Sequence, residues 1–225
     1  MMAGGEAVRL AVFDCDGTLA DGQAAICTAM ELAFAEAGLP VPERHAVRRI
    51  VGLSLPVAIR QLVPTAADDQ IVAAVDAYKT AFRAARLDGS LHEPLFDGIA
   101  PMLHRLHDAG WTLGVATGKS HRGLTSLLAA NQLGPLFATL HTADYHPSKP
   151  DPAMLEAAMD AVLAQPAATL MIGDTVYDMQ MAVAARTRAI GVAWGYHEVA
   201  ELLSAGAEAV AETPDELEAM INART

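Results

Sequence analysis

The chain is short of the features that mark secreted and membrane-spanning proteins. Its 225 residues include two cysteines, Cys15 and Cys27, and their spacing is not that of a metal site. The N-terminal stretch MMAGGEA has neither a basic segment nor an apolar core, so we expect no secretory signal. No segment approaches the roughly 20 consecutive apolar residues of a membrane-spanning helix. We therefore expect a cytoplasmic protein with reduced thiols and no membrane partner.

Positive charge is also scarce. The formal net charge is -12 at pH 7, which argues against nonspecific nucleic-acid binding because such binding needs a basic surface. Lysine occurs only at Lys79, Lys119 and Lys149, and the last two lie in predicted loops. Local positive charge of this kind is still compatible with a small anionic substrate.

Short apolar runs alternate with segments of helical periodicity. Buried strands are predicted at 8–13, 111–116, 137–140, 169–172 and 189–194, and helices at 101–109, 124–131, 152–163 and 176–186. Gly110 and Gly134 are predicted to end the helices before them, and a last helix is predicted with Thr213 as its cap and Pro214 at its first position. This alternation predicts an α/β fold, a doubly wound, Rossmann-like parallel sheet with helices on both faces.

The interval between the first two strands is much longer than a normal crossover. It contains no clear strand, and two sets of apolar residues recur in it at helical spacing: Ile26, Met30, Ala33 and Ala37, and Ile71, Val75, Tyr78 and Phe82. We expect residues 21–94 to form an inserted all-helical cap subdomain on a core domain made of residues 1–20 and 95–225. Turn-forming residues near both attachment points favour a hinge.

Polar residues follow several predicted strands, where ligands bind to open parallel sheets. These residues are Asp14, Asp16, Gly17 and Thr18 after the first strand, Thr117, Gly118 and Lys119 after the second, Lys149 after the 137–140 strand, and Gly173, Asp174 and Asp178 after the 169–172 strand. One crevice is thus predicted to collect several carboxylates, two lysines and a hydroxyl group.

Clustered carboxylates repel each other and need a cation, and hard oxygen ligands favour Mg²⁺. We expect Asp14 and Asp174 to bind the metal. The metal, Lys149 and the Thr117 hydroxyl would then cradle a phosphoryl group, whose transfer depends largely on electrostatic stabilisation. One carboxylate would attack phosphorus to give an acyl phosphate, and its neighbour would act as general acid and base.

The segments DCDGT, ATGK, SKPDP and GDTVYD occur in that order and resemble the four motifs of the haloacid dehalogenase-like hydrolase superfamily. The long helical insertion resembles the cap of its phosphoglycolate phosphatase-like branch. The resemblance implies a phosphatase of small phosphomonoesters, similar to phosphoglycolate phosphatase, that acts through an aspartyl-phosphate intermediate.

The resemblance also assigns roles to single residues. It makes Asp14 the nucleophile and Asp16 the general acid and base. The Asp16 backbone carbonyl would join Asp14 and Asp174 on Mg²⁺, and Asp178 would orient the metal's waters or Lys149. Thr117 and Lys149 would hold the phosphoryl oxygens.

Substrate contacts are expected from two regions. At the crevice these are Gly17, Thr18 and Gly118, although Gly118 replaces an Asn that is common in the second motif of relatives. In the insertion, HAVRRIVGLSLP resembles the substrate-specificity loop of the family, so Arg48, Arg49 and Gly52 are candidates. An arginine there would meet a second anionic group of the substrate.

Other activities remain as alternatives. Dehalogenation is disfavoured because family dehalogenases carry Tyr where Asp16 stands. Family phosphonatases form a Schiff base with a lysine of the cap. The lysine of this insertion, Lys79, lies on a periodic helix, which favours a solvated position over that role. A sugar phosphomutase similar to β-phosphoglucomutase shares both aspartates, although its relatives tend to carry Val at Thr18. A catalytically silent binding protein of the same fold is the alternative that is not an enzyme.

Overall fold

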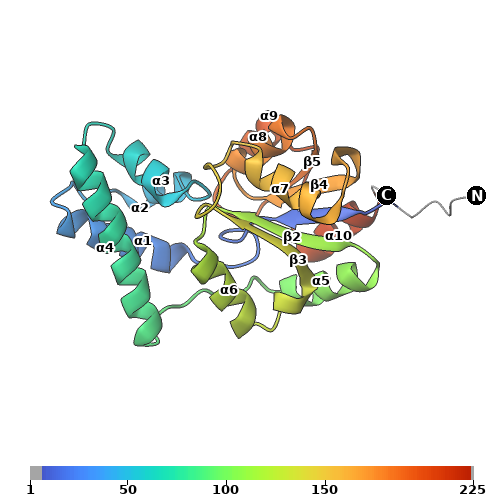
Figure 1. The fold of residues 1–225 in the computed structure, drawn as a ribbon, viewed down its shortest axis with the longest axis horizontal. Coiled ribbons are helices and arrows are strands. Elements are labelled where there is room, and N and C mark those ends of the chain that lie inside the picture. Colours follow the sequence, from blue (N-terminus) through green and yellow to red (C-terminus); the bar gives the residue numbers. More distant parts are fainter. Residues whose placement is uncertain (1–6, 224–225) are drawn as a thin grey trace, which may run out of the picture.

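The computed structural model describes residues 7–223; residues 1–6, on which the expectation about a secretory signal largely rests, lie outside this range. A six-stranded sheet with helices on both faces forms one body, and a group of helices forms a second (Figure 1). The strands are β1 (Leu10–Phe13), β2 (Thr112–Thr117), β3 (Phe137–Thr142), β4 (Thr169–Gly173), β5 (Arg188–Val192) and β6 (Ala209–Ala211). The predicted α/β fold is confirmed.

The order of the strands is β3-β2-β1-β4-β5-β6, and every pairing is parallel. The chain therefore builds outward from β1 in one direction through β3 and then in the other from β4. Phe13, the last residue of β1, pairs with Val115 and Ile172 of its two neighbours. The carboxyl ends of β1, β2 and β4 consequently meet at the point where the strand order reverses, which is where open sheets bind ligands.

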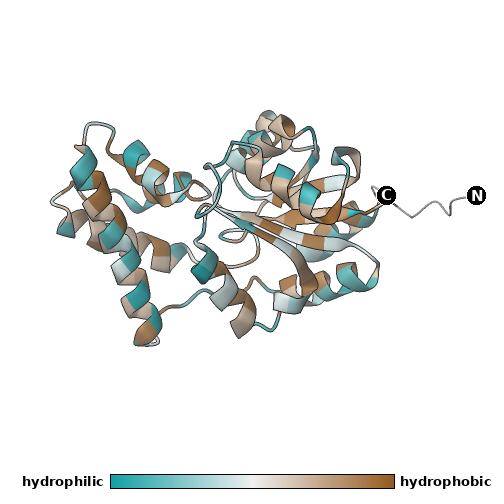
Figure 2. Cartoon of the chain, viewed as in Figure 1, coloured by the Kyte–Doolittle hydropathy of each residue, from teal (hydrophilic) through white to brown (hydrophobic). Residues whose placement is uncertain are grey.

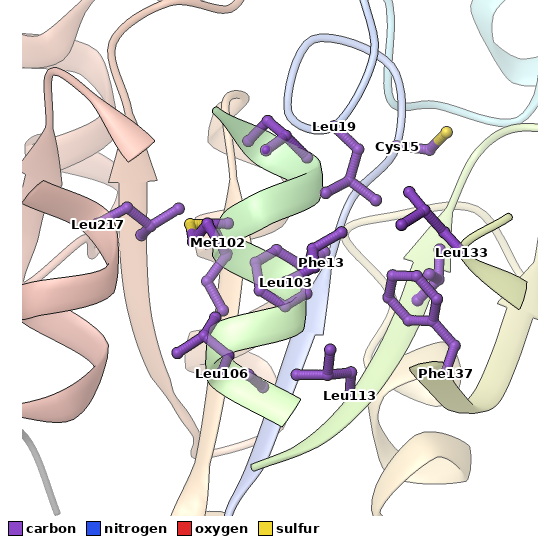
Figure 3. Packing of buried hydrophobic residues seen from close by; sticks show 14 of the residues in the cluster. Phe13, Cys15, Leu19, Met102, Leu103, Leu106, Leu113, Leu133, Phe137 and Leu217 are labelled. Carbon is purple, nitrogen blue, oxygen red and sulfur yellow. The ribbon is translucent and has the colours of Figure 1, made fainter. Parts of the chain in front are cut away.

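Alternation along each strand divides the core into two layers. Phe13 and Leu113 point to the face covered by α5 (Ile99–Asp108), α6 (His121–Ala130) and α10 (Pro214–Asn222), where Met102, Leu103 and Leu106 of α5 pack over β1 (Figure 3). Leu10 and Val12 point to the other face, covered by α7 (Ala153–Val162), α8 (Val176–Ala184) and α9 (Val199–Ala205).

Several helix ends agree with the sequence, and one does not. Gly110 follows α5 with a left-handed φ of 84°, and the Thr213 hydroxyl accepts a hydrogen bond from the Glu216 amide at the start of α10. The prediction that Gly134 ends a helix is wrong. The helix α6 ends at Ala130, its left-handed residue is Gln132 with φ 58°, and Gly134 begins a short 3₁₀ turn, η1 (Gly134–Leu136).

Two short elements were not predicted. The strand β6 has three residues and α9 has seven, so neither is long enough to display a clear period. A second 3₁₀ turn, η2 (Pro166–Ala168), leads into β4.

The insertion forms helices α1 (Gln23–Glu36), α2 (Arg44–Arg49), α3 (Leu55–Leu62) and α4 (Asp68–Leu87), which enclose their own core. Its fully buried side chains include Met30, Phe34 and Ile59. The two linkers to the sheet domain run side by side: the Asp21 amide donates to the Pro94 carbonyl at 2.8 Å, and Ala20 and Leu95 form an isolated bridge. The entry and exit of the insertion thus meet at one place.

Hydropathy follows this architecture. The central strands are apolar, whereas the outer helices mix apolar and polar residues (Figure 2). Among residues 7–223, no helix combines the length and apolarity that crossing a membrane requires.

Leu103→Ala tests the packing of α5. Leu103 is fully buried in the layer between α5 and the sheet, so we expect the free energy of unfolding to fall by about 2–5 kcal/mol. Urea denaturation followed by circular dichroism measures the loss. Leu163→Ala is the matched control, because the Leu163 side chain is 83% exposed and its truncation should change stability by less than about 0.5 kcal/mol. Equal effects of the two substitutions would contradict the assignment of this layer.

Candidate active site

Asp14 stands directly after β1 and is completely buried. Its amide donates to the Ile172 carbonyl, which extends the pairing with β4 by one residue. The Asp14 Oδ1 atom accepts a hydrogen bond from the Cys15 amide at 2.6 Å and lies 3.0 Å from Lys149 Nζ. The other oxygen, Oδ2, is buried and accepts no hydrogen bond from the described residues. This fixed carboxylate therefore keeps one oxygen available for a ligand or a reacting atom.

A tight turn that contains Gly17 and Thr18 follows Asp14 and holds the carboxylate of Asp174 in place. Gly17 has a left-handed φ of 87°, and a Cβ there would lie 2.2 Å from Asp174 Oδ2, so only glycine fits. The Thr18 hydroxyl donates to Asp174 Oδ1 at 2.7 Å, and the Tyr196 amide donates to Oδ2 at 3.0 Å. The structure places Gly17 and Thr18 against Asp174, outside the residues that line the pocket described below. They position Asp174.

Lys149 is almost completely buried and binds two carboxylates. Its Nζ atom lies 2.6 Å from Asp178 Oδ1 and 3.0 Å from Asp14 Oδ1. Burial disfavours the charged amine, but Asp14 and Asp178 outweigh this effect and raise the pKa of Lys149. Asp178 Oδ2 accepts hydrogen bonds from the amide and hydroxyl of Thr175, which caps α8. Asp178 therefore orients Lys149 from the first turn of a helix.

Asp14, Asp174 and Asp178 each offer an oxygen atom within 4.8 Å of the others. Burial raises the pKa of Asp14 to about 6. The charge of Lys149 opposes this rise, and the charge of Asp178 adds to it. Burial, followed by the charges of Asp14 and Asp178, raises the pKa of Asp174 well above its usual value. One ammonium group does not neutralise this cluster. The unpartnered Asp14 oxygen and the hard donor set fit a divalent cation.

Asp16 takes part in a network that the sequence did not indicate. Lys119 Nζ lies 2.9 Å from Asp16 Oδ1 and 2.5 Å from Glu93 Oε1, and all three side chains are about nine-tenths buried. Burial lowers the pKa of Lys119, but the charges of Asp16 and the neighbouring groups outweigh it and raise the value. Glu93 belongs to the second linker, so this network ties Asp16 to the attachment of the cap.

A pocket of about 610 Å³ opens between the two bodies and contains Asp14 and Asp16. Three further predicted site residues, Gly52, Thr117 and Gly118, line it. The described lining also includes cations that were not predicted to bind substrate: Lys79, Arg83 and Arg86 of α4, Lys119, and Arg122 of α6. Lys79 is exposed, as expected for a solvated helix face, but that face borders the pocket.

Arg48 and Arg49, the other cap residues predicted to contact substrate, lie outside the lining of this pocket. The Arg49 guanidinium forms a bidentate pair with Glu201 of the core, both contacts being 2.7 Å. The Arg49 carbonyl accepts a hydrogen bond from the Tyr177 hydroxyl and lies 3.2 Å from His197 Nε2. Arg48 is exposed. The loop around Arg49 therefore docks the cap on the core.

Gly118 lies directly beneath the cap. A Cβ at this position would lie 2.6 Å from the Leu53 carbonyl oxygen and 2.7 Å from that of Gly52. The Asn that relatives commonly carry would meet the same two atoms. The glycine therefore allows the cap loop to lie directly on the second motif.

Gly118→Ala tests this contact. The cap loop has to shift away from the added methyl group, so we expect kcat/KM for the best phosphate ester to fall by about tenfold or more. Steady-state phosphate release measures the effect. Gly134→Ala is the control, because a Cβ there meets nothing within 4 Å. Unchanged kinetics in Gly118→Ala would show that the loop does not need this position.

Comparisons with known proteins agree with the geometry. Residues 11–192 match the family described as haloacid dehalogenase-like hydrolase. A probable phosphatase, IndB, of Dickeya dadantii (strain 3937) is 36% identical over 92% of this chain and 91% of its own length. The N-acetylmuramic acid 6-phosphate phosphatase of Pseudomonas putida is 32% identical over 96% of both chains. A phosphoglycolate phosphatase of Pseudomonas syringae pv. syringae is 30% identical over 86% of this chain and 72% of its own length.

A solved structure has the same architecture. The crystal structure of a predicted phosphatase from Clostridium acetobutylicum superposes with a TM-score of 0.86 and 26% identity, over 97% of this chain and 100% of the other. The match over residues 11–192, the relatives and the shared fold together show that the chain belongs to the haloacid dehalogenase-like hydrolase family and is a phosphoric monoester hydrolase.

Proposed function

We propose that the chain is a Mg²⁺-dependent phosphatase of small phosphomonoesters, of the phosphoglycolate type, that acts through an aspartyl-phosphate intermediate. The observation that carries this proposal is the buried Asp14, whose Oδ1 atom is held by Lys149 and the Cys15 amide while Oδ2 has no partner among the described residues. A nucleophile needs such a fixed carboxylate with one free oxygen.

In the proposed first step, an Asp14 oxygen attacks phosphorus and the bond to the leaving alkoxide breaks. Asp16 supplies a proton to that alkoxide. In the second step, Asp16 takes a proton from water, and the water oxygen attacks phosphorus, which frees Asp14 and releases phosphate. Lys149 and Thr117 stabilise the charge on the phosphoryl oxygens. Asp16 lies close enough to the surface to exchange protons, because its side chain is 11% exposed.

Lys119 holds Asp16 in place through a largely buried ion pair. The Lys119 Nζ atom lies 2.9 Å from Asp16 Oδ1. Glu93 is the nearer partner of Lys119, at 2.5 Å.

Asp14, Asp174 and the Asp16 carbonyl are the proposed ligands of Mg²⁺, with Asp178 acting behind them through Lys149. When bound, the metal supplies positive charge to the phosphoryl oxygens during transfer. The crowding of carboxylates supports this assignment, since oxygen ligands of this kind favour Mg²⁺ among common cations.

The proposal names a small phosphorylated metabolite as the substrate and no nucleic acid as a partner. Relatives named for phosphoglycolate and for N-acetylmuramic acid 6-phosphate support a phosphate ester whose leaving group also carries a carboxylate. A reducing, cytoplasmic setting is part of the proposal, since Cys15 and Cys27 are both buried free thiols. Burial also raises the pKa of Cys15 well above its usual value, which keeps the thiol unreactive.

Asp14→Asn tests the nucleophile. The amide cannot form an acyl phosphate, so we expect phosphate release from a panel of esters to fall by at least about a thousandfold. Acid quenching and intact mass spectrometry should detect one phosphoryl group on the native chain and none on the variant. Asp108→Asn, at a carboxylate that is 84% exposed, is the control and should leave both readouts unchanged. Isomerisation of sugar phosphates without phosphate release would favour the mutase instead.

The pH dependence of metal binding follows from the raised pKa of Asp14. Below about pH 6 this carboxyl group holds a proton, which competes with the metal, and above it the group is ionised. We expect Mg²⁺ to raise the melting temperature by several degrees at about pH 8 and much less at about pH 5, as measured by differential scanning fluorimetry. In Asp174→Asn the rise in melting temperature on adding Mg²⁺ should be lost at both pH values. An equal shift across this range would contradict the assignment of Asp14 as a ligand.

A further inference from the structure

One wall of the pocket that contains Asp14 and Asp16 carries a row of positive charge. Lys79, Arg83 and Arg86 follow each other along α4 at spacings of four and three residues, so they share one face of the helix. Arg122, the second residue of α6, also lines the pocket. This wall is unusual in a chain whose formal net charge is -12.

None of these four cations has an ion pair or side-chain hydrogen bond within residues 7–223. Like charges four residues apart destabilise a helix, and a cation in the first turn of α6 opposes the helix dipole. Besides Asp14 and Asp16, the described lining contains one carboxylate, Asp144, and it accepts a hydrogen bond from the His121 amide. The wall is thus an unneutralised cluster that a bound anion would stabilise.

The position of α4 relative to the reaction centre follows from one contact. The Lys119 ammonium lies 5.8 Å from the centre of the Phe82 ring, and the same ammonium is bound to Asp16. Phe82 is therefore one side chain away from the general acid. Arg83 follows it directly, and Arg86 lies one helical turn farther along α4. Arg83 and Arg86 line the same pocket as Asp14 and Asp16, so a substrate held at these carboxylates could extend to the arginines.

The pocket is large enough for a substrate that carries more than a phosphoryl group. Its volume of about 610 Å³ is in the range of sites for drug-sized ligands and far exceeds what a phosphoryl group requires. Apolar and aromatic side chains also line the pocket, among them Ile26, Met30, Leu55 and Tyr78. A leaving group with an extended, partly apolar body fits this space.

We propose that the substrate is a phosphomonoester whose leaving group carries a second anionic group, a carboxylate or a phosphate, which Arg83, Arg86 and Arg122 bind. This inference rests on the proposed function and deepens it, because it assigns the second anion to α4 and α6 and not to the loop of Arg48 and Arg49. Guanidinium groups suit this role because they bind carboxylates and phosphates in a bidentate manner.

The test compares esters that differ in one charge. N-acetylmuramic acid 6-phosphate differs from N-acetylglucosamine 6-phosphate by an ether substituent that carries a carboxylate, and fructose 1,6-bisphosphate differs from fructose 6-phosphate by a second phosphate. We expect kcat/KM to favour the charged member of at least one pair by about tenfold or more. The pair that shows the preference identifies the second anion as a carboxylate or a phosphate.

Charge-removing variants then locate the preference. We expect Arg86→Gln and Arg122→Gln to reduce kcat/KM for the charged ester by about tenfold, mainly through KM, and to leave the neutral ester and p-nitrophenyl phosphate unchanged. Arg44→Gln is the matched control: it removes the same charge from the cap, but Arg44 pairs with Glu31 and lies outside the pocket lining.

Two results would overturn the inference in distinguishable ways. Hydrolysis of charged and neutral esters with equal efficiency, or equal losses on both in the arginine variants, would overturn this inference and leave the proposed phosphatase intact. No Mg²⁺-dependent release from any ester, p-nitrophenyl phosphate included, would overturn the proposed function and this inference together.

Discussion

The mutual repulsion of three buried carboxylates is the constraint around which this molecule is built. Asp14, Asp174 and Asp178 bring like charges into a dry site, a costly arrangement unless each oxygen has a partner. The buried Lys149 supplies one counter-charge, the Thr175 cap binds Asp178, and the Thr18 hydroxyl binds Asp174. The side chains of Asp174 and Tyr196 pack so closely against Gly17 that this position has no room for a side chain. A site that is electrostatically incomplete by itself is well suited to bind a cation and a phosphoryl group.

The cap contributes to the same site through charge as well as shape. Glu93, at its second attachment, and Lys119 extend the network to Asp16, while the Arg49–Glu201 pair holds the opposite side of the cap against the core. The Glu93–Lys119–Asp16 network is largely buried and connects the cap to Asp16. The Arg49–Glu201 pair lies at the surface, where ion pairs contribute little stability. The attachment of the cap is therefore linked directly to Asp16 through a buried network.

The strand-end residues could be predicted because their placement is a local property. An apolar run that ends in Asp14 and Asp16 needs only the rule that parallel strands share their carboxyl edge to meet Thr117 and Asp174. Glu93 gave no such signal, since it lies in an irregular linker and reaches Lys119 only in the folded molecule. The periodicity also grouped Ile71 and Val75 correctly as the buried face of α4. It could not decide whether Arg83 faces solvent or the pocket, because that depends on how two separately packed bodies dock.

The pairing of the two linkers has a consequence for how such proteins diversify. The insertion leaves the sheet domain at Asp21 and returns at Pro94, and these two residues are hydrogen-bonded to each other. A segment whose ends meet in this way can be lengthened, shortened or exchanged without moving any strand, because the core is closed at the junction. The helices of the cap can thus change during evolution while the strand ends that hold Asp14 and Asp174 stay in place. The same junction is a natural position for grafting a foreign cap onto this core.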